Sequence, residues 1–116
     1  MGIQNLAENV ILVDAPAEPG LNEELKNVTE IVRERGDCDI VIDFSHVDIV
    51  TSSSLSKLLK LRKVLLDCEH RLLLCSVASA TKGIFSITAL DGVFEMVDDQ
   101  FAALASLGNQ TADQRL

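Results

Sequence analysis

The sequence predicts a layered α/β fold in which most strands of the sheet are parallel. Short apolar runs alternate along the chain with stretches whose apolar residues recur every three or four positions, which is typical of alternating strands and helices. The strongest strand candidate, 39–44, contains Ile40, Val41 and Ile42 in succession. Such a run indicates a strand covered on both faces, as in parallel sheets. The 116 residues, 47% of them hydrophobic, are enough for one domain with an aliphatic core.

Each expected element follows from a local pattern. Apolar runs between loop residues predict the strands, and apolar residues at spacings of three and four predict the helices. In chain order, we expect a strand at 10–13, a helix at 22–35, a strand at 39–44, a helix at 52–68, a strand at 71–76, a short helix at 81–88, a short strand at 94–97 and a last helix at 98–107.

Capping residues and glycines predict where the helices begin and end. Asn22 is expected to cap the first helix and Gly36 to end it, because Asn is a favoured N-cap and Gly a favoured residue just past a helix. Gly108 is expected to end the last helix. We therefore expect a single domain at 1–108 and a flexible C-terminal tail at 109–116.

The charge and the cysteines exclude several classes of function. Eighteen acids against ten bases give a net charge of −8, which argues against nucleic acid and anionic membranes as partners. Cys38, Cys68 and Cys75 form no CxxC pair and lie at no metal-ligand spacing from a histidine, so we expect reduced thiols, no metal and no cofactor. The N-terminal segment lacks the basic start of a signal peptide, and we expect a cytoplasmic protein.

A run of four hydroxyl residues, Thr51 to Ser54, lies between an apolar stretch and the amphipathic segment 52–68. One hydroxyl would suffice as a helix N-cap, so the run favours a cap and a modification site about equally. A phosphate there would lie beside the unpaired N–H groups of a helix start. A serine hydrolase using Ser52 with His46 is less favoured, because the GxSxG motif is absent.

The stretch 41–59, VIDFSHVDIVTSSSLSKLL, resembles the core signature of STAS domains, the sulfate-transporter and anti-sigma-factor-antagonist modules. That signature is an apolar strand with an acid and a serine, then Asp-Ser-Ser/Thr-Gly-Leu at a helix start. Segments 72–77, 84–94 and 101–104 resemble later parts of the same domain, so the resemblance covers about 9–107.

The resemblance implies a STAS-like, SpoIIAA-like fold: a mixed sheet of four to five strands with helices mainly on one face. It implies an anti-sigma factor antagonist that binds a serine-kinase anti-sigma factor and is released when the kinase phosphorylates it, with a phosphatase to reset the cycle. By position, Ser52 is the implied phosphorylation site and Ser53 the next hydroxyl, while Asp43 is the acid that ends the central strand. No catalysis by the chain itself is implied, and we expect a monomer or weak dimer.

Two positions differ from the family pattern: Thr51 replaces the Asp and Ser54 replaces the Gly. Thr51 can still cap the helix, but the loop loses a charge, so binding without a phosphorylation cycle is an alternative. The predicted partner-binding residues are Asp43, Thr51, Ser52, Ser53, Ser54, Lys57 and Lys60. Further alternatives are a STAS scaffold or sensor subunit, and a module that binds a small ligand.

Overall fold

The computed structural model describes the backbone of 2–88, 90 and 92–115, and the side chains of 3, 5–88, 90 and 92–107. Nine elements follow one another along the described chain. They are β1 (Gly2–Ala7), β2 (Val10–Asp14), α1 (Gly20–Arg35), β3 (Asp39–Asp43), α2 (Ser52–Asp67), β4 (Leu72–Cys75), α3 (Ser79–Ile87), β5 (Glu95–Val97) and α4 (Gln100–Arg115).

The five strands form one mixed sheet in the order β1-β2-β3-β4-β5. β1 is antiparallel to β2, and the other neighbours are parallel. Because β2, β3 and β4 are parallel and in register, with Asp14 opposite Asp43 and Asp43 opposite Cys75, their carboxyl ends lie along one edge of the sheet. The loops that lead into α1, α2 and α3 leave the sheet at this edge.

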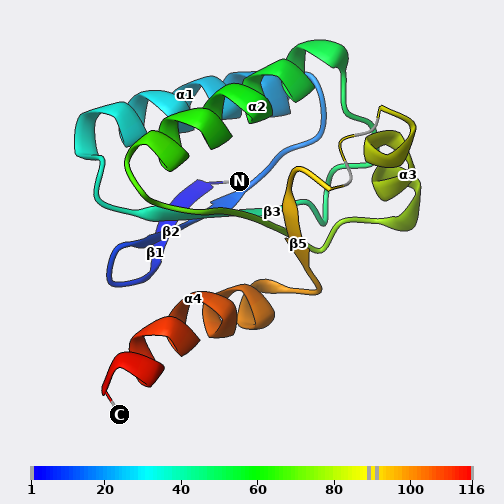
Figure 1. Cartoon of the computed structure of the whole chain (residues 1–116). Helices are drawn as coiled ribbons and strands as arrows, with labels where there is room; N and C mark the ends of the chain where they lie inside the picture. The colour runs from blue at the N-terminus through cyan, green and yellow to red at the C-terminus, as the bar shows by residue number, and fades with distance from the viewer. Residues whose placement is uncertain (1, 89, 91, 116) are drawn as a thin grey trace.

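Helices cover both faces of the sheet. α1 and α2 lie side by side on one face, and α4 lies on the opposite face (Figure 1). α3 adds Phe85 to the cluster of buried residues beneath α1 and α2. Three of the four helices of the described chain therefore pack on one face, which confirms the expected fold of a mixed sheet with helices mainly on one side.

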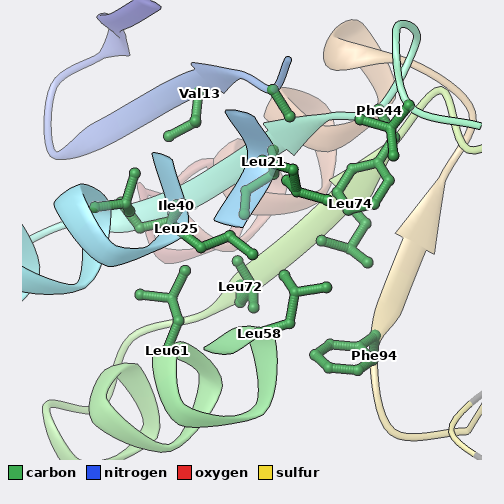
Figure 2. Packing of buried hydrophobic residues seen from close by; sticks show 14 of the residues in the cluster. Val13, Leu21, Leu25, Ile40, Phe44, Leu58, Leu61, Leu72, Leu74 and Phe94 are labelled. Atoms are coloured by element: carbon green, nitrogen blue, oxygen red, sulfur yellow. The ribbon is translucent and has the colours of Figure 1, made fainter. Parts of the chain in front are cut away.

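The residues of β3 divide between two hydrophobic clusters. Ile40 and Ile42 pack against Leu25, Leu58 and other residues of α1 and α2, as Figure 2 shows for part of the cluster. Val41 points to the other face and belongs to the cluster that contains Ala103 of α4. Successive side chains of a strand point to opposite faces, so the unbroken apolar run reflects burial on both faces, as the sequence predicts.

The larger differences from the sequence prediction concern β1, α1 and α4. β1 was not expected, because its residues carry no apolar run, and its strand conformation depends on antiparallel pairing with β2. α1 begins at Gly20 with Pro19 at the N-cap position, so Asn22 does not cap it. α4 continues past Gly108 to Arg115, because a helix tolerates an interior glycine at a cost of about 1 kcal/mol. The flexibility expected for 109–116 stays a prediction.

Candidate functional site

The hydroxyl run lies at the N-terminus of α2, at the carboxyl edge of the parallel strands. Thr51 is the N-cap residue, with extended backbone angles of φ −76° and ψ 162°. Its Oγ1 accepts a hydrogen bond from the N–H of Ser54 at 3.1 Å. Thr51 therefore caps the helix as expected, and the replacement of the family Asp keeps the capping oxygen.

A carboxylate from another loop completes this cap. Glu18, in the loop between β2 and α1, accepts hydrogen bonds at Oε2 from the N–H of Thr51 at 2.9 Å and from its hydroxyl at 3.1 Å. Burial raises the pKa of Glu18. The hydroxyls of Ser54 and Thr51 and the N–H groups of Thr51 and Asn22 lower it by more, so this pKa lies below its ordinary value. The negative charge missing at position 51 is thus supplied by Glu18, at the helix end where an anion is favoured.

Asn22 connects α1 to the next two hydroxyls. Its Nδ2 donates to Ser53 Oγ at 2.7 Å and to Ser54 Oγ at 3.4 Å. Ser53 Oγ also accepts from Lys57 Nζ at 3.4 Å, one turn further along α2. Ser54 is fully buried, so the predicted contact between its side chain and a partner is limited by this burial.

Ser52 differs from its three neighbours. It is the first residue of α2, its side chain is exposed, and its hydroxyl makes no hydrogen bond with any group that the structure describes. Thr51 caps the helix, Ser53 is held by Asn22 and Lys57, and Ser54 is buried. Ser52 therefore presents a hydroxyl that an approaching enzyme could modify without breaking an internal contact.

Asp43 ends β3 below this loop. Only 8% of its surface is exposed. Its Oδ1 accepts from the N–H of Ser45 at 2.8 Å, and its Oδ2 accepts from Gln100 Nε2 at 3.4 Å. The bond to Ser45 lies at the beginning of the loop between β3 and α2, and the bond to Gln100 connects the end of β3 to the beginning of α4. Asp43 is therefore placed to position the loop, and a direct contact with a partner, as predicted, is limited by its burial.

α3 holds the loop between β3 and α2, which alternates between buried and exposed residues. The Thr81 hydroxyl lies 3.3 Å from the carbonyl oxygens of both Val47 and Asp48, and Thr81 itself is buried. His46 and Ile49 are exposed, Ile49 by 63%. Among the described residues His46 makes no hydrogen bond with Ser52, so the nucleophile–base pair of the hydrolase alternative is not assembled.

Of the predicted site residues, the structure gathers Thr51, Ser52 and Ser53 on one exposed edge, with Lys57 next to them. Lys60 lies one turn further along α2 and is exposed. Sequence reasoning missed Glu18, Asn22 and Thr81. The prolines around Glu18 indicate only a loop, and Asn22 fits the pattern of a helix N-cap. No local pattern indicates that either residue contributes to a site more than 30 residues away. Among the described residues, no group of three potential metal ligands occurs, and no helix is long and apolar enough to cross a membrane.

The comparisons with known proteins agree with this geometry. The family model described as STAS domain matches residues 12–103. The fold is similar to that of an anti-sigma-factor antagonist (STAS) domain protein from Planctomyces limnophilus, with a TM-score of 0.77 and 18% identity over 92% of this chain and 97% of that one. It is also similar to the anti-sigma factor antagonist SpoIIAA in its unphosphorylated form, with a TM-score of 0.71 and 14% identity over 91% and 96% of the two chains.

SpoIIAA of Bacillus in its phosphorylated form matches with a TM-score of 0.64 and 14% identity over 88% of this chain and 95% of that one. No curated protein matches the sequence. Identities this low establish the fold alone, whereas the family model spans most of the chain. This chain belongs to the STAS-domain family.

Proposed function

We propose that this chain is a stand-alone anti-sigma factor antagonist, which binds a serine-kinase anti-sigma factor and is switched off when that kinase phosphorylates Ser52. The observation that carries the proposal is the exposed hydroxyl of Ser52 at the first position of α2, without a hydrogen bond to the described residues around it. Ser53, which Asn22 and Lys57 hold, is the second candidate.

The structural neighbours support this proposal. SpoIIAA, which has the same fold, is described as an anti-sigma factor antagonist and exists in unphosphorylated and phosphorylated forms. Binding to an anti-sigma factor is therefore the role that the fold and the exposed serine favour together. We further propose that the protein acts in the cytoplasm, has no catalytic activity of its own, works as a monomer or weak dimer, and is reset by a phosphatase.

The electrostatics of the loop explain how a phosphate would release a partner. A phosphoserine carries about −1.5 to −2 charges at pH 7. Glu18 already occupies the N–H and hydroxyl of Thr51, so a phosphate on the next residue cannot bind these donors and is repelled by the carboxylate. The added charge would lie at the surface where we propose that the partner docks. Burying such a charge without a partner costs several kcal/mol, which corresponds to a loss of affinity of orders of magnitude.

The proposal is tested with the purified chain, ATP and each serine-kinase anti-sigma factor encoded with it. We expect one kinase to add one phosphoryl group, about 80 Da by intact mass. The Ser52→Ala variant should lose this gain, whereas Ser53→Ala, the matched control at the neighbouring hydroxyl, should keep it. The phosphorylated chain should no longer bind the kinase.

Two outcomes would contradict the proposal in different ways. Stable binding to a kinase without any mass gain would favour constitutive binding, the alternative that the replacements at Thr51 and Ser54 raise. A mass gain that persists in Ser52→Ala and disappears in Ser53→Ala would move the switch to the second hydroxyl.

A further inference from the structure

The outer surface between α1 and α2 contains a groove of about 130 Å³ that is separate from the Ser52 hydroxyl. Four residues of α1 and two of α2 line it. They are Lys26, Thr29, Glu30, Arg33, Lys57 and Lys60. On α1 the residues recur at spacings of three and four, so they share one face of the helix.

The groove concentrates positive charge on an acidic protein. Four of the ten Lys and Arg residues of the chain line it, against one carboxylate, Glu30, so its formal charge is 4 − 1 = +3 while the whole chain carries −8. The ion pairs among the described residues involve none of these four cations. Lys26, Arg33 and Lys60 are exposed, so their charges are available to a ligand.

The spread of charge and the lining of the groove favour a polypeptide with several carboxylates over a nucleotide. Lys26 and Arg33 are seven residues apart, which spreads the charge over about 10 Å along the helix axis. The groove lies beyond the first turn of both helices, where backbone N–H groups are engaged within the helix. No aromatic side chain lines it for a base to stack on.

We infer that this groove, the α1–α2 basic groove, binds an acidic segment of a partner protein. Lys57 connects it to the switch loop, because its Nζ lies 3.4 Å from Ser53 Oγ while its side chain also lines the groove. A partner docked at Ser52 can therefore extend along α2 and place carboxylates between the two helices. The inference rests on the proposed function in one respect only, namely the identity of the protein that carries the acidic segment.

The test uses the full chain and a fluorescent polyglutamate peptide long enough to span the groove, and it needs neither kinase nor ATP. At low ionic strength we expect saturable binding that weakens strongly at physiological salt, because salt screens exposed charges. Amide chemical-shift changes should cluster at 26–33 and 57–60. The double variant Arg33→Glu with Lys60→Glu should bind at least about tenfold more weakly. Glu30→Gln, which removes the repelling carboxylate, should bind more tightly.

The matched control is the double variant Lys63→Glu with Lys82→Glu, which makes the same charge change at exposed positions outside the groove. Equal losses in both double variants, dispersed shift changes, or no binding at low salt would overturn the inference. The inference would also be overturned if inorganic triphosphate displaced the peptide and bound more tightly than the peptide, because the groove would then prefer phosphates. Thermal unfolding of each variant shows that it is folded. A failure here leaves the phosphorylation test of Ser52 unaffected.

Discussion

Glu18 Oε2 accepts two hydrogen bonds from Thr51, a residue 33 positions later, at 2.9 and 3.1 Å. The contact joins the loops that follow two neighbouring parallel strands, β2 and β3, whose ends lie opposite each other at Asp14 and Asp43. The N-terminus of α2, where Ser52 is exposed, therefore depends on a loop that precedes α1.

The first prediction concerns Glu18. Its pKa is lower in the folded chain than in the unfolded one, so its contribution to stability is complete above the unfolded pKa of about 4.3 and is lost as the pH falls through the folded pKa. We expect Glu18→Gln to lower the free energy of unfolding by about 1 kcal/mol at pH 7. The difference from the original chain should shrink below about pH 4. Urea unfolding across this pH range measures both values. Glu30→Gln, at an exposed position on α1, is the control and should change stability by less than about 0.5 kcal/mol.

The second prediction concerns the cap of α2. Thr51→Ala removes the oxygen that accepts from the N–H of Ser54 and the hydroxyl that donates to Glu18. We expect a loss of about 1–2 kcal/mol in the free energy of unfolding. Thr51→Ser keeps both hydrogen bonds and should remain within about 0.5 kcal/mol of the original chain. A Thr51→Ala variant as stable as Thr51→Ser would show that the cap does not stabilise the fold.

The third prediction tests the orientation of α2 with two adjacent leucines. Leu58 is fully buried beneath the helix, whereas Leu59 is 37% exposed. We expect Leu58→Ala to cost about 2–5 kcal/mol, because it leaves a cavity in the core. Leu59→Ala should cost much less, about 1 kcal/mol or below. Equal losses in chemical denaturation would mean that the helix is rotated relative to the sheet.

The fourth prediction concerns thiol reactivity. Burial raises the pKa of Cys75 to about 11 and also raises the pKa of Cys38, and both residues are buried. Cys68 is only partly buried. Since the thiolate is the reactive form, iodoacetamide at pH 8 should label Cys68 first in the folded chain. All three thiols should react in urea. Peptide mass mapping measures the order, and early labelling of Cys75 would contradict its burial at the end of β4.

Much of the fold could be predicted from the sequence because periodicity reports burial. The run Ile40-Val41-Ile42 indicated a strand covered on both faces, and its side chains do divide between the two hydrophobic clusters. The leucines of α2 and the position of Ser52 at its start followed in the same way from local spacing. β1 could not be predicted, since its partner strand, and not its own residues, determines its conformation.

The roles of the individual hydroxyls were decided by tertiary structure. By itself, the sequence determined that a hydroxyl run opens an amphipathic helix after a buried strand, because both features depend on neighbouring residues. Only the folded chain decided that Thr51 pairs with Glu18 and that Asn22 holds Ser53. It also decided that Ser54 is buried and that Ser52 is exposed. The physical reason is that parallel strands bring loops more than 30 residues apart to one edge of the sheet, and a hydrogen bond across such a distance has no local pattern in the sequence.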